Sequence, residues 1–317
     1  MDNETMFTPS RITYSNLDML AKESGKLHEE SLCEMSFAAK KLAIEISEGI
    51  EGGMSINELM AVLSEELPFA PSEPSEGTPD LTVSSVRKFI RQQNGINKAA
   101  FAKMLASELL EAGITVSEAS YLDTEDQPQT FSYVKNSLSD EAFDVFSQEF
   151  SDPRIIYAQN FREACMAVAE RKAGYCILPF EEKGGVRIPT RSALVSSLDL
   201  KIIAITPVFG FEGTADMKYA LIGRSFIIPE CDDVTDRYFE FTVSRRSNIS
   251  LGELLSAAEY LSYSVFKVHT AVSDDAESEG WFTLIIKDGG DTFAPFLTYL
   301  SLFADEWEPA GLYKNIE

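Results

Sequence analysis

Residues 173–190, AGYCILPFEEKGGVRIPT, carry an apolar run directly into a charged turn. The run YCILPF at residues 175–180 predicts a short buried strand. Glu181, Glu182 and Lys183 follow it without a spacer. Such a turn is most often a solvated loop, but charged side chains at the end of a buried strand also form walls of binding sites. The stretch therefore predicts a core strand and raises the question of a site at its end.

Strands and helices alternate on both sides of this stretch. A strand is expected at residues 154–159 and a helix at 161–174, and an earlier strand is expected at 114–122. Two more strands are expected downstream, at residues 200–209 and 217–223. Strands that alternate with helices predict a parallel or mixed sheet with helices against it.

The C-terminal part repeats the alternation in a different order. Its pattern predicts strand, helix, strand, strand, helix and strand at residues 237–244, 250–263, 265–273, 281–289, 291–305 and 307–316. This is the ferredoxin-like order, in which two helices cover one face of a four-stranded antiparallel sheet.

The N-terminal part has the periodicity of helices. Helices are expected at residues 28–50, 55–67, 82–93 and 97–113, and a loop rich in Pro, Ser and Glu at 68–80. Ser55 and Glu58 have the spacing of a capping box at the start of the second helix. Helices of this kind bury their apolar stripes against one another, which predicts a small bundle.

Charge and composition exclude several kinds of partner and cofactor. The chain has 27 Lys and Arg against 51 Asp and Glu, a formal net charge of -24. Such a polyanion repels phosphate backbones and anionic lipid headgroups, so neither nucleic acid nor a membrane is expected as a partner. His28 and His269 stand apart from Cys and carboxylate clusters, so no metal site is expected, and no motif calls for a cofactor.

Cysteine usage and the N-terminus predict a cytoplasmic protein. The four cysteines are widely separated and read as reduced thiols, at Cys33, Cys165, Cys176 and Cys231. The chain has no apolar run of the roughly 20 residues that a membrane span needs, and its first residues do not have the pattern of a signal peptide.

The opening stretch and its flanks resemble the prephenate dehydratase family. The family's short turn, strand and Pro-Ile-Glu-Asn-Ser/Thr turn match this chain in type and spacing at Phe161, Val168, Ala173, Tyr175, Pro179, Phe180 and Glu181. The segment SLDLKIIAITPV is similar to the family's next strand. Thr130, Phe131 and Ser132 are similar to part of the turn that follows the family's first strand. The C-terminal unit resembles the family's regulatory module, the ACT domain.

The resemblance implies a multidomain protein of the α+β and α/β classes. The helical periodicity places a bundle at residues 1–113, and the resemblance places a reduced, periplasmic-binding-protein-like α/β domain at 114–232. A ferredoxin-like βαββαβ ACT domain follows at 233–317. Between the strands at 200–209 and 217–223 the family inserts an entire second lobe, and this chain has almost no room for it.

The departures from the family predict a protein that does not catalyse the dehydration. That reaction needs a proton donor and cations around the substrate carboxylates. Glu182 and Lys183 replace the family's Asn-Ser, and the Thr-Arg-Phe motif aligns with Met217, Lys218 and Tyr219. No catalytic residue is expected, and the leading interpretation is a binding or regulatory protein.

Two alternatives stay open. One is an active prephenate dehydratase in L-phenylalanine biosynthesis, which converts prephenate to phenylpyruvate with Glu181, Thr190 and Lys218. The other is a structural adaptor, which recruits a protein partner through its acidic surface and the loop at 68–80.

The resemblance also implies ligand contacts, to an amino acid or to an aromatic pathway intermediate. In the first domain they are Thr130, Ser132 and Glu181. In the ACT domain the family's ligand-binding Gly lies at the start of the first helix, which here gives Leu251, Gly252, Glu253 and Leu254. The strands at 265–273 and 281–289 are apolar enough to need covering, so a homodimer through this domain is expected.

Overall fold

One mixed sheet runs through the protein. The computed structural model describes residues 11–56, 58–60, 93–116, 127–182, 184–209, 215–226, 237–271, 281–287 and 293–316. The sheet has ten strands in the order β2-β1-β3-β6-β5-β10-β7-β9-β8, with β4 beside β3. The strands are β1 (Thr130–Val134), β2 (Arg154–Ala158), β3 (Tyr175–Glu182), β4 (Val186–Arg187), β5 (Lys201–Phe209), β6 (Ala215–Gly223), β7 (Arg237–Ser244), β8 (Ser264–Ala271), β9 (Trp281–Lys287) and β10 (Trp307–Asn315).

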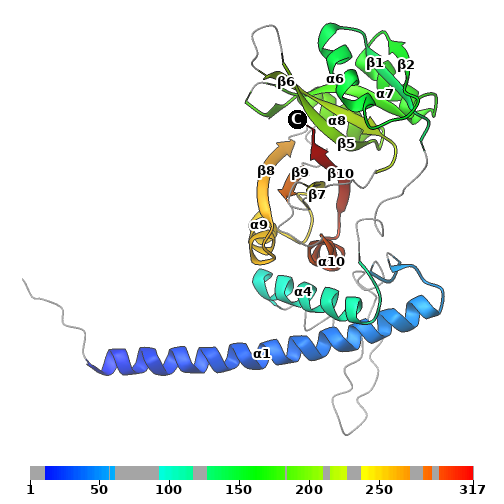
Figure 1. Ribbon diagram of the computed structural model, residues 1–317. Helices are drawn as coiled ribbons and strands as arrows, with labels where there is room; N and C mark the ends of the chain where they lie inside the picture. The colour runs from blue at the N-terminus through cyan, green and yellow to red at the C-terminus, as the bar shows by residue number, and fades with distance from the viewer. Residues whose placement is uncertain are drawn as a thin grey trace, which may run out of the picture.

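Helices cover both faces of the first half of this sheet and one face of the second half, and further helices extend below it (Figure 1). They are α1 (Arg11–Glu51), α4 (Gly95–Glu111), α6 (Ser137–Ser147), α7 (Phe161–Ala169), α8 (Pro189–Ser197), α9 (Leu251–Tyr260) and α10 (Ala294–Phe303). Among the described helices, none has both the length and the apolar character that crossing a bilayer requires.

The first half of the sheet is covered on both faces. Strands β2, β1 and β3 are parallel to one another, and β6 is antiparallel to β3 and to β5. Side chains that alternate along β1 and β3 enter two separate cores. Phe131 and Tyr175 pack with α6 on one face, and Cys176 and Leu178 pack with α7 and α8 on the other. Strand β3 is therefore buried on both faces, which its continuous apolar run predicts.

The second half has the order β, α, β, β, α, β that the sequence predicts. Its strands lie in the order β10-β7-β9-β8 and are antiparallel. Phe239 and Phe241 point from β7 into a core with α9 and α10. The two halves join where β10 pairs with β5 in parallel, and the Ile316 N–H donates to the Ile205 carbonyl oxygen at 2.8 Å. The sheet is thus continuous across the junction.

The N-terminal helices cover the helical face of the second half. Helix α4 lies between α1 and the pair α9 and α10, and the N-terminal part of α1 extends past it (Figure 1). Phe101 and Leu105 of α4 belong to the same core as Leu254 of α9 and Leu297 of α10. Most of the expected stripe on α1 is buried, but Phe37 and Ile44, which were expected in it, are exposed. Part of the burial of α4 is against the βαββαβ unit.

Several expected elements differ from the structure. Helix α1 begins at Arg11, before the expected residue 28, and residues 114–116 have no regular structure. The expected loop at 68–80 lies outside the described residues, and so do residues 61–67, 82–92 and 117–122 of the expected helices and strand. The domain boundaries at 113 and 232 stay predictions.

The first strand of the sheet was misplaced by the resemblance. Thr130, Phe131 and Ser132 do not lie in a turn after a strand, as the alignment implied, because they form part of β1 itself. The turn comes after Val134, and Asn136 then caps α6 by accepting the Ser139 N–H at 2.9 Å. The aromatic and β-branched run TFSYV and this cap were the available signals for β1 and α6.

Candidate functional site

Glu181 lies in a short hairpin at the end of β3. The hairpin pairs Glu181 with Arg187 of β4, and Gly184 and Gly185 form the turn with φ values of 91° and 77°. Left-handed backbone of this kind suits glycine, which explains the Gly-Gly pair in the sequence. Although they belong to a turn-like segment, Glu181 is only 2% exposed and Arg187 only 9%. The hairpin is therefore packed against another part of the protein.

Arg187 binds a carboxylate of the other half of the sheet. Its Nη1 and Nη2 donate to Oε1 and Oε2 of Glu240 on β7, both at 2.6 Å. The hydroxyl of Tyr313 on β10 donates to the same carboxylate at 3.1 Å. A bidentate Arg–carboxylate contact is the strongest geometry for an ion pair, and the burial of both partners removes the screening by water.

Glu181 is held by a second cation from the same face. The Lys267 ammonium on β8 donates to Oε1 and Oε2 of Glu181 at 3.0 and 2.9 Å, and to the Gly185 carbonyl oxygen at 3.3 Å. Arg187 adds a longer contact to Glu181 Oε1 at 3.4 Å. We call Glu181, Arg187, Glu240, Lys267 and Tyr313 the junction cluster. It ties the hairpin to the face of the βαββαβ sheet that α9 and α10 leave free.

The charges of the junction cluster shift the pKa values of its members. Burial alone would raise the pKa of Glu181, but Lys267 and Arg187 outweigh it and hold the pKa below its ordinary value of 4.5. Burial would lower the pKa of Arg187, but Glu240 raises it. Nearby on β8, burial and the charge of Arg187 lower the pKa of His269, and its Nε2 has no hydrogen-bond partner among the described residues. Glu181 is therefore ionised and His269 neutral at pH 7.

The structure brings together two of the three residues that the alternative of an active dehydratase would use. Lys218 on β6 lies opposite Glu181 in the β3–β6 ladder, and its charge also lowers the Glu181 pKa. Thr190 lies in the first turn of α8, where it is exposed. Glu181 itself is surrounded by protein side chains.

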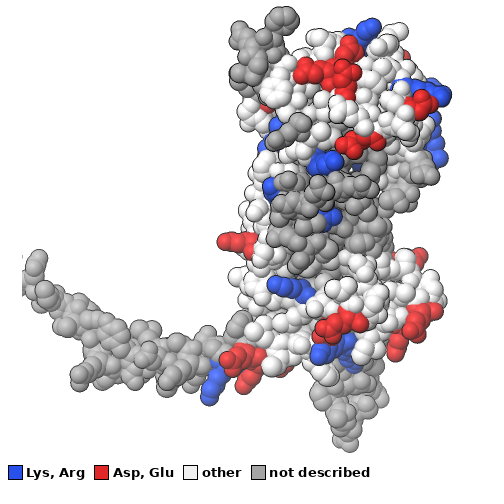
Figure 2. All heavy atoms as spheres, viewed as in Figure 1, with Lys and Arg blue, Asp and Glu red and all other residues white. Residues whose placement is uncertain are grey.

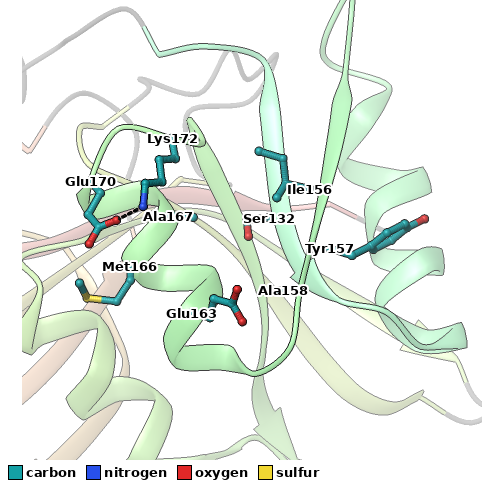
Figure 3. Close-up of a pocket in the computed structure, with 9 residues that line it drawn as sticks. All are labelled: Ser132, Ile156, Tyr157, Ala158, Glu163, Met166, Ala167, Glu170 and Lys172. Carbon is teal, nitrogen blue, oxygen red and sulfur yellow. Dashed lines mark ion pairs between the residues drawn. The ribbon is translucent and has the colours of Figure 1, made fainter.

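A separate hollow of about 200 Å³ lies between α7 and the edge strand β2 (Figure 3). Its lining residues come from β1, β2 and the outer side of α7 with the turn after it, and they are Ser132, Ile156, Tyr157, Ala158, Glu163, Met166, Ala167, Glu170 and Lys172. In Figure 3 Ser132 lies on the sheet between the helix and β2. One residue expected to contact a ligand, Ser132, therefore lines this hollow.

Ser132 is a buried polar group without a partner. Its side chain is 0% exposed, and its hydroxyl has no hydrogen bond within the described part of the chain. A buried hydroxyl of this kind is unfavourable unless a water or a ligand satisfies it. Charges stand at both ends of the hollow, because Glu170 pairs with Lys172 at 2.6 Å and Glu163 accepts the Gln159 N–H at 2.8 Å. The hollow thus offers one hydroxyl, an apolar wall and groups of both signs.

The other residues expected to contact a ligand lie elsewhere. Thr130 is half-buried at the start of β1. Glu253 closes a capping box with Ser250 at the start of α9, and its carboxylate lies 3.7 Å from the Lys98 ammonium of α4. Leu254 is fully buried in the core that α9 shares with α4, whereas Leu251 and Gly252 lie in the first turn of α9. A ligand contact at this helix start stays a prediction.

The other members of the junction cluster are less visible in the sequence than Glu181. Glu240 and Lys267 each interrupt an apolar run on a predicted strand, which is a signal of a charged contact on an otherwise buried face. Nothing in the sequence pairs Lys267 with Glu181, which lies 86 positions away. Within the described ranges, no three His, Cys, Asp or Glu side chains come together as a metal site requires.

Comparison with known proteins finds likeness in structure alone. No model of a protein family matches the sequence, and no curated protein matches it. A solved structure described as "GqqA- a novel type of quorum quenching acylases" is 18% identical, with a TM-score of 0.45 over 59% of this chain and 95% of its own. Prephenate dehydratase from Streptococcus mutans is 14% identical, with a TM-score of 0.47 over 59% of this chain and 99% of its own. Prephenate dehydratase from Staphylococcus aureus is 10% identical, with a TM-score of 0.43 over 58% of this chain and 100% of its own. At these values the likenesses carry no inference about activity.

Proposed function

We propose that this chain is a regulatory protein that binds a small molecule and does not catalyse a dehydration. The observation that carries the proposal is the state of Glu181. A general acid has to be protonated at the working pH, which usually requires a raised pKa. The Glu181 pKa is lowered, and both carboxylate oxygens accept hydrogen bonds from Lys267. A carboxylate held in this way cannot supply a proton to a leaving hydroxyl.

The binding site in this proposal is the hollow that Ser132 lines. Its volume of about 200 Å³ is below the roughly 300 Å³ at which pockets for drug-sized ligands begin, so its ligand is small. Ile156 and Met166 offer apolar contact, and the Ser132 hydroxyl can donate or accept one hydrogen bond. Charges of both signs at the ends suit a zwitterion. We therefore favour an amino acid, with an aromatic pathway intermediate as the second choice.

A binding screen with matched serine variants tests this proposal. Thermal shift followed by calorimetry would measure the binding of amino acids and aromatic pathway intermediates to the wild type, Ser132→Ala and Ser192→Ala. The Ser192 hydroxyl on α8 also has no partner in the described chain, but it does not line the hollow. We expect Ser132→Ala to weaken binding about 5- to 10-fold, the effect of one lost hydrogen bond, and Ser192→Ala to bind as the wild type.

The stability of the same variants separates binding from folding. Because the Ser132 hydroxyl has no partner, Ser132→Ala should leave the free energy of unfolding unchanged or raise it slightly. Equal affinity in the wild type and Ser132→Ala, or no binding of any member of the screen, would count against a ligand site in the hollow.

A further inference from the structure

Strand β2 is the outermost described strand at one end of the sheet, and its pairing with β1 shows which of its backbone groups point outward. The Arg154 N–H donates to the Gln129 carbonyl oxygen at 2.9 Å, and the register then runs without a shift from Arg154 to Ala158. Backbone groups alternate in direction along a strand. Arg154, Ile156 and Ala158 therefore turn their N–H and C=O groups to β1. Ile155 and Tyr157 turn theirs outward, where no strand of the described residues follows.

This edge lacks several of the features that protect exposed strands. Ile155, Ile156 and Tyr157 are consecutive large apolar residues, and they are 38%, 42% and 50% exposed. β2 contains no proline and no bulge. The opposite edge, β8, has a register shift between Val265 and Lys267, and Lys267 points inward to Glu181. Bulges and inward charges discourage edge pairing, so β2 is the edge open to a partner strand.

We propose that β2 pairs antiparallel with β2 of a second copy of this chain, about a two-fold axis at Ile156. In this register Ile155 lies opposite the Tyr157 of the second copy. Both residues turn their hydrogen-bonding groups outward, so each pair exchanges two main-chain hydrogen bonds. The arrangement is self-complementary, as a two-fold interface requires. It does not depend on the proposed function.

Charge complementarity favours a second copy over an unrelated peptide. In this register Arg154 lies opposite Ala158 of the second copy, which lines the hollow together with Glu163. The Arg154 side chain is 74% exposed, and its pairing with the equally exposed Asp152 contributes little. The Arg154 side chain of each copy can therefore reach Glu163 of the other copy. The two-fold axis repeats this contact, so it forms twice. Lys and Arg side chains are visible at this end of the molecule amid its acidic surface (Figure 2).

Analytical ultracentrifugation with matched edge variants tests the pairing. Ile155→Lys places a charge on β2, and Val268→Lys places one on β8 at a residue that is also 38% exposed. We expect a dimer for the wild type and for Val268→Lys, and a monomer for Ile155→Lys with unchanged circular dichroism. A wild type that is monomeric at every concentration would overturn the proposal. So would a dimer that Val268→Lys abolishes and Ile155→Lys does not, because that result places the interface on the βαββαβ unit.

Charge reversal tests the register. Arg154→Glu and Glu163→Arg should each weaken the dimer by at least about fivefold, because each puts like charges at both contacts. In an equimolar mixture of the two variants every mixed dimer regains opposite charges at both contacts, so dimerisation should return. A mixture that associates no better than either variant alone would overturn this register.

Discussion

Arg187 connects two carboxylates that are buried with it. It binds Glu240 through both terminal nitrogens and lies 3.4 Å from Glu181 through Nε. Its guanidinium also lies over the Phe180 ring, 4.3 Å from the centroid. A buried ion pair is not in itself strong evidence of added stability, but removing one partner leaves an unpaired charge in the interior.

Replacing Arg187 should therefore be costly. We expect Arg187→Met to lower the free energy of unfolding by about 3–5 kcal/mol, because Glu240 and Glu181 lose a cation while both stay buried. Urea denaturation would measure the loss. Arg162→Met, at an exposed residue of α7, is the matched control and should change stability by no more than about 0.5 kcal/mol. Equal effects of the two substitutions would mean that the junction cluster does not hold the hairpin in place.

At the scale of single residues, the sequence singles out Glu181 as a candidate but does not predict which residues contact it. Glu181 was predictable because it directly follows a continuous apolar strand. Its partner Lys267 was not, because the contact depends on how a hairpin docks on a strand 86 positions away. Ser132 was singled out for a reason that the structure corrects, since the residue lies inside β1 and not in a turn.

At the scale of elements, strand β7 shows how the contact between the two halves of the sheet changes the burial of a strand. A ferredoxin-like sheet leaves one face uncovered by its helices. Here Phe239 and Phe241 face α9 and α10, while Tyr238 belongs to the core of the first half of the sheet. The result is a strand buried on both faces, which explains why its run RYFEF does not alternate cleanly between apolar and polar residues.

Strand β8 should make stability depend on pH through His269. The pKa of this imidazole is lowered from 6.5, and burial is the largest cause. Four nearby charges also shift it, those of Arg187, Glu240, Lys267 and Glu181. The unfolded chain therefore takes up a proton at His269 at a higher pH than the folded chain. Stability from this residue is complete above pH 6.5 and is lost as the pH falls toward the lower pKa of the folded state.

Chemical denaturation at a series of pH values checks this sign. Between about pH 7 and pH 5 the wild type should lose more free energy of unfolding than His269→Gln, which has no imidazole to titrate at this position. The Glu181 pKa is lowered, so this residue destabilises the protein only when the pH falls below the ordinary pKa of 4.5. Glu181 therefore does not affect the comparison between pH 7 and pH 5. Parallel curves for the two proteins would show that His269 is not shielded from protonation.

The helices α1 and α4 were predictable as elements but not in their packing. Their apolar stripes predict burial against helices, and α4 does pack on α1. The sequence does not say that α4 also covers α9 and α10, because small residues such as Ala99 and Ala257 fit many partners equally well. One core consequently runs from α1 to the sheet.

For the whole molecule, the continuous sheet is the feature that pattern analysis could not supply. The second half was predicted in element order and the first half only as a mixed α/β unit, but the parallel pairing of β5 with β10 joins strands of two separately predicted units. The pairing places the end of β3 against the free face of the second half. Glu181 is thereby bound to the protein's own cations, Lys267 and Arg187.

Incubation of the wild type with prephenate, followed by absorbance of phenylpyruvate, tests the central claim most directly. We predict the same rate as in buffer alone, and the same rate for Glu181→Gln, since an ionised carboxylate that binds Lys267 supplies no proton. Formation of phenylpyruvate by the wild type that disappears in a folded Glu181→Gln variant would contradict the claim and establish the enzyme.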